Sequence, residues 1–471
     1  MSRTFNAPPP LIAGSENHVS ALRAWNLMTR HAPAAAFAAT RTDDVVAAVR
    51  YARHRGLGVA PTATGHGIPA VGDDGVLVST AGMRRVDIDP GRRTARIGAG
   101  ARWADLHSAS APHGLVGVAG SSSQVGVVGF TQGGGFGWLS RRLGFASSSV
   151  RAAELVTADG SVHEVDDLHN PDVRWGVAGG AGNLGVVTRL TIDLHRVGEP
   201  GAAGPTTVHG GNLYYPVERA AEVAIFYAGW APRLPREVMS ALTFRWFPPA
   251  SAVPTPLRGR TFVAIRACAS GLSWIGEELV QLARTALGAP VADTFTALPA
   301  HDLDAISADP TTPVPAIQRG ETLRELDEDA ITVLAEEAQP ADGPPLVMVE
   351  LRQLGGAMDD APRGPHPMAR TRGAYSVNAV SLVPNAEAQA PARARQNRLF
   401  DRLRPHLTGD TYLNFLDGGG ATPQRVRAAY DDADWARLVD LKAALDPDNT
   451  FRFGRTIHPT PPNPSPNGEP S

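Results

Sequence analysis

The chain has 471 residues, of which 19% are charged and 43% hydrophobic, and its formal net charge is −3. This length allows two domains with substantial cores, and the balanced charge offers no basic field for a nucleic-acid partner. Cys268 is the only cysteine and Lys442 the only lysine. These counts exclude an intrachain disulfide, a cysteine-based metal site and, except at Lys442, lysine Schiff-base chemistry. We expect no metal site.

No run of about 18 apolar residues occurs, so we expect no membrane span. The N-terminus lacks the basic and apolar regions of a signal peptide. These features predict a cytoplasmic protein, and we expect a monomer or a homodimer.

The first third of the chain alternates helices with short strands. Residues 17–30 are expected to form a helix, and 45–53 a second, amphipathic helix within a βαβ-type step. Strands are predicted within 75–82, 84–90 and 94–100, and a helix within 101–114. Two further strands are predicted within 151–165, followed by a helix around Trp175 and a strand over 186–197.

Glycine clusters interrupt this pattern. Residues 117–138, GVAGSSSQVGVVGFTQGGGFGW, contain too many glycines for a helix or an ordinary strand, which indicates close approach of the backbone to a ligand. Residues 180–185 match the dinucleotide pattern G-x-G-x-x-G. That pattern must follow a strand and open a helix, whereas here a helix precedes it and a strand follows, which argues against an NAD site. The alternative is that the loops 62–67, 120–137 and 179–185 jointly hold a phosphate-bearing cofactor through backbone N–H groups.

The first of these loops contains an unusual histidine. In PTATGHGIPA, residues 61–70, His66 stands between Gly65 and Gly67. An isolated histidine of this kind is usually an ordinary turn residue. With two further glycine loops in the same region, we favour a second interpretation, in which the glycines let the backbone close on a bulky ligand that His66 contacts.

The remaining chain indicates a second unit and a return to the first. Composition changes near 198–212, which we interpret as a domain boundary. Strands are predicted within 240–249, 261–270, 346–356 and 374–383, with helices over 274–287 and 321–337. This order predicts an antiparallel sheet with helices on one face. A final helix is expected over 433–445, and the proline-rich end cannot pack a core. The expected divisions are 1–205, 206–405, 406–458 and a disordered tail at 459–471.

Several segments together resemble the berberine-bridge-enzyme-like FAD-linked oxidases, which share the vanillyl-alcohol-oxidase-type fold. The resemblance spans nearly the whole length. It rests on TGHG, QVGVVGFTQGGGFGWLSRRLGFASSSV, NPDVRWGVAGGAGNLGVVTRLTIDLH, VELRQLGGAM, YLNF and RLVDLKAALDPDNTFR. It implies an α+β protein: a two-domain, PCMH-type FAD-binding fold with a separate substrate domain of antiparallel sheet covered by helices.

The resemblance also implies FAD as cofactor, covalently bonded through its 8α-methyl group to His66. The residues that it places around the flavin are Thr64, Gly65, His66, Gly67, Ser121, Ser122, Gly126, Gly129, Gly133, Gly134, Gly135, Gly137, Gly182, Asn183, Gly185, Val186, Val187, Tyr412 and Asn414. An alkylated imidazole would leave an electron-poor flavin, which is a stronger hydride acceptor. The alternative is a non-covalent FAD that His66 only hydrogen-bonds.

The sequence departs from the family pattern at several positions. Many members carry a second flavin bond from a cysteine, but the matching run here is Gly120 to Ser123, and serine cannot form that thioether. A single, histidyl link is therefore expected. Thr62 replaces the family's arginine and Val128 the first of its paired glycines. Both changes bear on pyrophosphate binding and oxygen access.

Candidate catalytic residues are Glu350, Arg352, Tyr412 and Asn414. Glu350 and Arg352 share one strand face, and in an apolar cavity a glutamate with a raised pKa would be a base. The alternative is an exposed or arginine-paired carboxylate. A strand would likewise point Tyr412 and Asn414 to one face, with Tyr412 lining the flavin cavity or packing as a core tyrosine. Phe415 stands where related alcohol oxidases have tyrosine. Further cavity candidates are Tyr214, Arg245, Arg266 and Tyr375.

These observations predict an FAD-dependent oxidase acting on a small aromatic, polyketide-like or amine substrate of secondary metabolism. Hydride would pass to flavin N5, with O2 as acceptor. Two alternatives stay open: a dehydrogenase of the same fold that reacts poorly with oxygen, and a flavin-bound scaffold enzyme without redox turnover.

Overall fold

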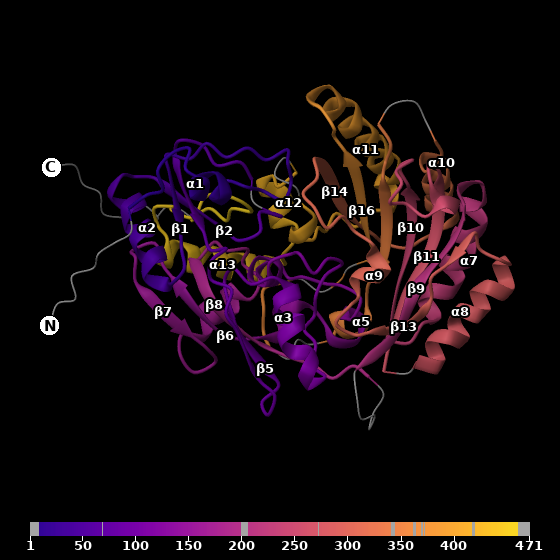
Figure 1. Ribbon diagram of the computed structural model, residues 1–471, viewed down its shortest axis with the longest axis horizontal. Coiled ribbons are helices and arrows are strands. Elements are labelled where there is room, and N and C mark those ends of the chain that lie inside the picture. The colour runs from indigo at the N-terminus through magenta and orange to yellow at the C-terminus, as the bar shows by residue number, and fades with distance from the viewer. Residues whose placement is uncertain are drawn as a thin grey trace.

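The computed structural model describes residues 9–459 except 68, 199–205, 272, 341–343, 361–363, 369–370, 372 and 417–419. The chain has an α+β fold built from separate sheets, as predicted (Figure 1). Elements before residue 198 and after residue 411 lie together, and one large sheet occupies the other side of the molecule. Most of the tail 459–471 and the boundary between 205 and 206 lie outside the described residues, so both stay predictions.

The predicted βαβ-type step is present near the N-terminus. Strands β1 (Ala35–Ala38) and β2 (Gly58–Thr62) both pair in parallel with β3 (Gly75–Ser79), and α2 (Thr42–His54) connects β1 to β2. The Asp44 carboxylate accepts the backbone N–H of Arg41, which closes the first turn of α2.

The first predicted helix is shorter than expected. Helix α1 spans only Glu16–Ala21, so the prediction of a helix to residue 30 is wrong beyond Ala21. The backbone that follows pairs with distant segments: Trp25 N donates to Gly65 O (3.1 Å) and Leu27 N to Val314 O (3.1 Å). These N–H groups therefore bond distant segments instead of the preceding turn of a helix.

A five-stranded antiparallel sheet follows. Its order is β4 (Val86–Asp89), β5 (Thr94–Gly98), β8 (Val186–Asp193), β6 (Val150–Val156) and β7 (Val162–Val165). Helices α3 (Trp103–Ser110) and α6 (Pro171–Val177) accompany it. Helix α6 precedes the G-x-G-x-x-G pattern and β8 follows it, which confirms the predicted order.

The glycine-rich stretch 117–138 contains a short helix, α4 (Val127–Gln132), and α5 (Ser140–Leu143) comes after it. The prediction that this stretch excludes helix is therefore wrong over six residues. Only Gly129 lies inside α4, and the remaining glycines flank it.

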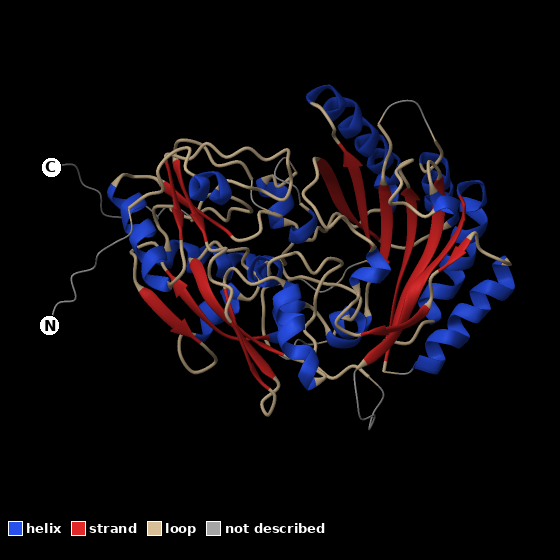
Figure 2. Cartoon of the chain, in the orientation of Figure 1, coloured by secondary structure: helices blue, strands red, loops and turns tan. Residues whose placement is uncertain are grey.

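Residues 207–382 form an eight-stranded sheet in which every pair is antiparallel. The order is β12 (Ala292–Asp293), β9 (Thr207–Pro216), β11 (Thr261–Ser270), β10 (Val238–Trp246), β15 (Met348–Gln353), β16 (Tyr375–Leu382) and β14 (Ala316–Leu323), with β13 (Thr296–Pro299) also beside β9. Helices α7 (Ala220–Trp230), α8 (Ser273–Leu287), α10 (Glu328–Glu337) and α11 (Gln389–Leu403) cover one face, as expected (Figure 2).

The helix predicted over 321–337 begins later than expected. Glu321 belongs to β14, and α10 begins at Glu328, where the Asp327 side chain accepts the N–H of Ala330. The short helix α9 (Asp304–Ser307) lies on the opposite face of the sheet, toward the glycine loops.

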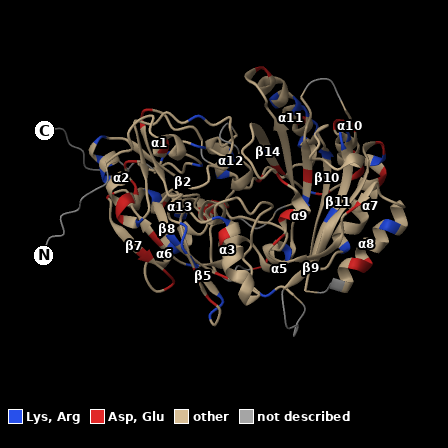
Figure 3. Cartoon of the chain, in the orientation of Figure 1, with Lys and Arg blue, Asp and Glu red and all other residues tan. Residues whose placement is uncertain are grey.

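The C-terminal segment packs on the N-terminal part through α12 (Pro423–Arg427) and α13 (Asp432–Leu445). Leu438 of α13 contacts the cluster that contains Trp175, and Phe451 joins the core around β1–β3. Acidic and basic residues are interspersed along the elements (Figure 3).

Candidate functional site

His66 lies in the loop after β2, and its imidazole is held by two neighbours. Nδ1 is 2.8 Å from Thr64 Oγ1, and the ring stacks on Trp25 with 4.3 Å between centroids. Nε2 is buried and has no hydrogen-bond partner among the residues that the structure describes. Burial, with a smaller contribution from the charge of Arg102, lowers the pKa of His66 to about 4. The imidazole is therefore neutral at physiological pH and keeps a nucleophilic lone pair.

The glycine before His66 is required by the protein itself. Gly65 has φ +72°, and a Cβ there would lie 2.7 Å from Ala24 Cα. Arg455 Nη1 donates to Gly67 O at 3.0 Å, and its guanidinium lies beside Gly67. The missing Cβ therefore makes room for Ala24 at Gly65 and lies beside Arg455 at Gly67. That these glycines also let the backbone close on a ligand stays a prediction.

The three glycine loops converge although they are far apart in the sequence. Gly126 lies against Thr64, because a Cβ at Gly126 would be 3.5 Å from Thr64 Oγ1. Ala181 N donates to Gln132 O at 3.0 Å, which joins the second loop to the third. Beside them is open room: a Cβ at Gly129 would meet no atom within 4 Å, and one at Gly182 would meet only Gln132 Oε1, at 4.0 Å.

The other predicted cofactor residues of these loops contact protein. The absent Cβ makes room for Asn414 at Gly133, Met368 at Gly134, Phe130 at Gly135, Ala119 O at Gly137 and Val156 O at Gly185. Val186 and Val187 are buried in two apolar clusters. The Asn183 side chain bonds Arg455 O (2.9 Å) and Ile457 N (2.8 Å), so it attaches the third loop to the C-terminal segment.

Asn414 fixes the second loop. It lies in a 3₁₀ turn, Leu413–Phe415, so the strand expected at Tyr412 and Asn414 is wrong. The side-chain Nδ2 donates to Phe130 O at 3.1 Å, and Oδ1 accepts from Gly135 N at 3.3 Å. Asn414 therefore holds both ends of the Phe130–Gly135 segment.

We predict that Asn414→Leu, which keeps the volume but removes both bonds, lowers the free energy of unfolding by about 1–3 kcal/mol. Urea unfolding of the flavin-loaded protein measures it. Asn397→Leu is the matched control, because Asn397 accepts one exposed bond, from Arg319. Equal effects of the two variants would contradict the assigned role of Asn414.

Tyr412 packs in an aromatic cluster. Its ring centroid is 4.9 Å from that of Phe136 and 6.1 Å from that of Phe145, and burial raises its pKa strongly. Phe415 also contacts Phe136. Of the two predicted alternatives, a core position describes the ring of Tyr412 better.

Glu350 is paired with two arginines. Its Oε2 is 2.8 Å from Arg266 Nη1 and its Oε1 is 2.6 Å from Arg352 Nη2, and all three side chains are buried. Burial alone would raise the pKa of Glu350, but the charges and hydrogen bonds of Arg352 and Arg266 lower it below its ordinary value. The prediction of a raised pKa is wrong, and the arginine-paired alternative holds.

The sheet register places these groups in rows on one face. Arg266 of β11 and Arg352 of β15 both pair with Ala241 of β10, and Tyr214 lies one row away, in the row of Glu350. Tyr375 pairs with Gln353 and lies on the opposite face, in the core under the helices. Tyr375 is therefore excluded as a neighbour of the Glu350 cluster.

Helix α9 connects this cluster to the second glycine loop. The Asp304 carboxylate accepts from Ser123 N (2.9 Å) and Ser123 Oγ (2.6 Å), and Ser307 Oγ accepts from Trp138 Nε1 (2.9 Å). Arg352 Nη2 is also 3.4 Å from Ser121 Oγ. The neighbouring Ser122 Oγ accepts from Gln124 N.

Two residues of this region were not identified from the sequence. Trp25, placed in an expected helix, stacks on His66. Asp309, after α9, has its pKa raised to about 6, mainly by burial. Its only sequence signal is an Asp-Pro pair, which indicates a turn.

The residues fit a flavin cofactor. In the described part of the chain, no hydrogen-bond partner reaches the buried Nε2 of the neutral His66, and open room adjoins Gly129 and Gly182. His66 would hold the flavin ring, and backbone groups of the second and third loops its phosphates.

Comparison with known proteins agrees with this site. Residues 33–166 match the family described as FAD binding domain, and 411–458 match berberine and berberine-like proteins. An FAD-linked oxidoreductase of Dictyostelium discoideum is 25% identical over 95% of this chain and 93% of its own. (R)-6-hydroxynicotine oxidase of Paenarthrobacter nicotinovorans is 25% identical over 88% and 89%.

Among solved structures, 6-hydroxy-D-nicotine oxidase from Arthrobacter nicotinovorans aligns with a TM-score of 0.82 at 22% identity, covering 98% of this chain and 100% of that one. This likeness confirms the predicted fold. Within the described residues, no helix has the length and apolar character needed to span a bilayer.

Proposed function

We propose that this chain, which belongs to the berberine-like FAD-linked oxidoreductases, is an oxidase that holds FAD through one covalent bond to His66. Its substrate would be a small aromatic, polyketide-like or amine molecule. The observation that carries the proposal is the neutral, partly buried imidazole of His66, whose buried Nε2 has no hydrogen-bond partner among the described residues at the junction of the glycine loops.

A single bond follows from the residues available. Ser122 occupies the position of the second, cysteinyl link in many relatives, and a hydroxyl forms no thioether. Cys268 is fully buried in β11, and burial raises its pKa to about 12, so it is an inert thiol. His66 is thus the proposed attachment point on its own.

FAD supplies the two-electron acceptor for the reaction. The chain fixes the second glycine loop in place: Asn414 bonds to that loop, and α9 attaches it to the eight-stranded sheet. Glu350 stays ionised between Arg266 and Arg352, because their charges lower its pKa. The three residues therefore form an ion-pair cluster, and Glu350 is not a proton acceptor.

The proposed substrate class and the proposed acceptor O2 are supported by similarity to known relatives. A relative that covers most of this chain is named (R)-6-hydroxynicotine oxidase, which favours a small nitrogenous or aromatic substrate and oxygen as acceptor. Phe415 carries no exchangeable proton, which disfavours sugars and simple alcohols. A cytoplasmic location and a monomeric or homodimeric state complete the proposal.

We predict that the purified protein, mixed without air with a panel of amines, phenols and aromatic alcohols, loses its visible flavin absorption with a subset of them. Admitting air should restore the absorption and release hydrogen peroxide, with turnover of about 1–1,000 per second for a good substrate. Slow recovery in air would instead identify a dehydrogenase. Bleaching by no compound would contradict redox function and favour the flavin-bound scaffold.

A further inference from the structure

The end of α9 and the residue after it, 306–308, are held in one position by two arginines. Arg266 Nη2 donates to Ile306 O and Ser307 O, both at 2.6 Å, and Arg245 donates to Ser307 O and Ala308 O, both at 2.7 Å. Ala308 has φ +49°, a left-handed conformation that is costly for a residue with a Cβ. Such strain persists only where the surroundings enforce it, and it places the next residue, Asp309.

Asp309 is a carboxylate for which the described residues provide no direct partner. Its side chain is half-buried, and within the described residues no hydrogen bond or ion pair reaches it. The charged groups around it are Arg245 of β10, Arg266 of β11, and Glu350 and Arg352 of β15. The guanidinium groups of Arg245 and Arg266 are already bound to backbone carbonyls, and Arg266 also to Glu350.

This environment distinguishes Asp309 from Glu350. Burial raises the pKa of Asp309 to about 6; Arg266 and Arg245 oppose the rise, and the negative charge of Glu350 adds to it. Asp309 can therefore take up and release a proton near neutral pH, whereas Glu350 is locked in its charged form.

Both ends of the segment reach the candidate flavin loops. At one end, Asp304 binds Ser123, and Ser307 binds Trp138. At the other, Val314 O accepts from Leu27 N, and Val314 N donates to Trp25 O at 3.3 Å. Trp25 stacks on His66. Asp309 thus belongs to a short connection between the second glycine loop and the histidine loop.

We propose that Asp309 is the proton acceptor for the group that this enzyme oxidises, an inference that rests on the proposed oxidase function. The substrate carbon would lose its hydrogen as hydride, a proton with two electrons, to FAD. The proton on the neighbouring oxygen or nitrogen would pass to Asp309 Oδ, and a C=O or C=N bond forms. Asp309 then returns its proton to water.

The test compares Asp309→Asn with wild type and with Asp302→Asn, a control at an exposed aspartate of the same segment. With a substrate that bleaches the flavin, anaerobic reduction at pH 7.5 should be about 100-fold slower in Asp309→Asn and unchanged in the control. The wild-type rate should rise with pH through about 6 and then level, because only the carboxylate accepts the proton. Asp309→Asn should lack that rise. Reoxidation of photochemically reduced flavin by O2 should be equal in all three proteins.

A second measurement needs no substrate. The visible spectrum of the bound flavin, titrated from acid to alkaline pH, should show a transition near pH 6 in wild type and Asp302→Asn, and none in Asp309→Asn. A transition retained in Asp309→Asn, or reduction at the wild-type rate with an unchanged pH profile, would overturn the role of Asp309 and leave the oxidase proposal intact. If no compound bleaches the flavin, the oxidase proposal fails, and the spectral titration alone decides whether Asp309 faces the flavin.

Discussion

Replacing His66 by alanine is expected to abolish acid-stable flavin completely. Wild-type protein that is precipitated with acid and washed should stay yellow and fluoresce, whereas the His66→Ala pellet should be colourless and release its FAD. The reason is that the neutral imidazole of His66 offers a nucleophilic atom at this position, whereas Ser122 cannot form the second bond. Flavin fluorescence of the denatured chain on a gel measures the result.

The variant should still fold, because His66 is only partly buried and makes one side-chain hydrogen bond, to Thr64. FAD bound without a covalent link should be a weaker hydride acceptor, so the anaerobic reduction rate should fall as well. His113→Ala, at an exposed histidine, is the control. Acid-stable flavin in His66→Ala would refute the link, and a colourless wild-type pellet would favour non-covalent FAD.

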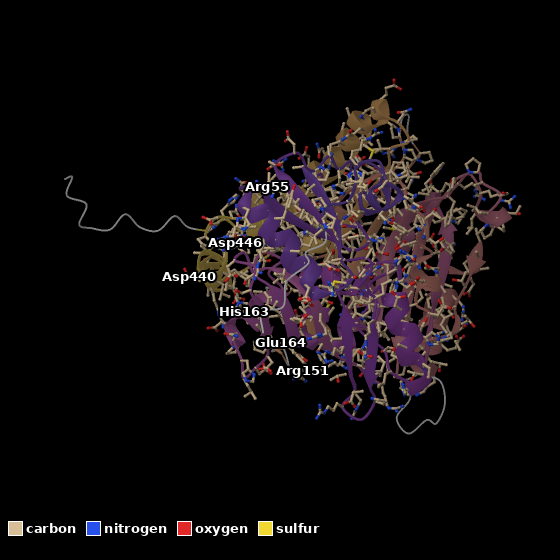
Figure 4. The ribbon with its side chains drawn as sticks, turned by 60° about the vertical axis from the view of Figure 1, so that its left-hand side comes forward. Arg55, Arg151, His163, Glu164, Asp440 and Asp446 are labelled. Carbon is tan, nitrogen blue, oxygen red and sulfur yellow. The ribbon has the colours of Figure 1, made fainter. Side chains whose placement is uncertain are left out.

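The second large effect is expected at Asp446. Lys442 Nζ and Asp446 Oδ2 lie 2.6 Å apart with both side chains fully buried (Figure 4 labels Asp446). Lys442 also donates to Asn183 O and Phe451 O, and Asp446 accepts the N–H groups of Thr450 and Phe451. This pair therefore joins α13 to the third glycine loop and to the C-terminal segment.

Asp446→Ala should lower the free energy of unfolding by about 3–5 kcal/mol, because it leaves a buried ammonium without its counter-ion. Urea unfolding measures this loss, and FAD retention should fall with it, since Lys442, which donates to Asn183 O, loses its counter-ion. Asp432→Ala on the same helix removes an exposed ion pair, with 99% of that side chain exposed, and should change stability by about 0–1 kcal/mol. Similar losses in both variants would contradict the importance of the buried pair.

Local sequence patterns predicted most strands correctly, because each strand alternates or concentrates apolar residues between turn residues. They failed where distant segments decide the conformation. Residues 25–27 have helical character but pair with Gly65 and Val314. Glu321 looks helical from its neighbours, yet its backbone pairs with Val377 of β16.

Those parts of the candidate site that lie in short sequence motifs could be predicted. His66 and the glycine loops stand out in the sequence, and the structure brings those loops together. Their roles differ, because most of the glycines make room for protein side chains or carbonyls, which no local pattern reveals. Asn414 was selected by its motif, but its bonds to the second loop depend on folding.

Charged groups were the least predictable part. The alternation in β15 correctly placed Glu350 and Arg352 on one face. The pKa of Glu350 depends on Arg266, which comes from another strand, so its direction could not be read from VELRQLGG. Asp309 acquires its raised pKa mainly from burial, which only the folded chain creates, and it carries no motif.

The burial of Lys442 has a practical consequence for handling the protein. It is the only lysine in the chain, and its side chain is fully buried, so no lysine amine is exposed at the surface of the folded protein. Reagents that acylate amines should therefore leave Lys442 of the folded chain unmodified. Acylation of Lys442 would then report unfolding.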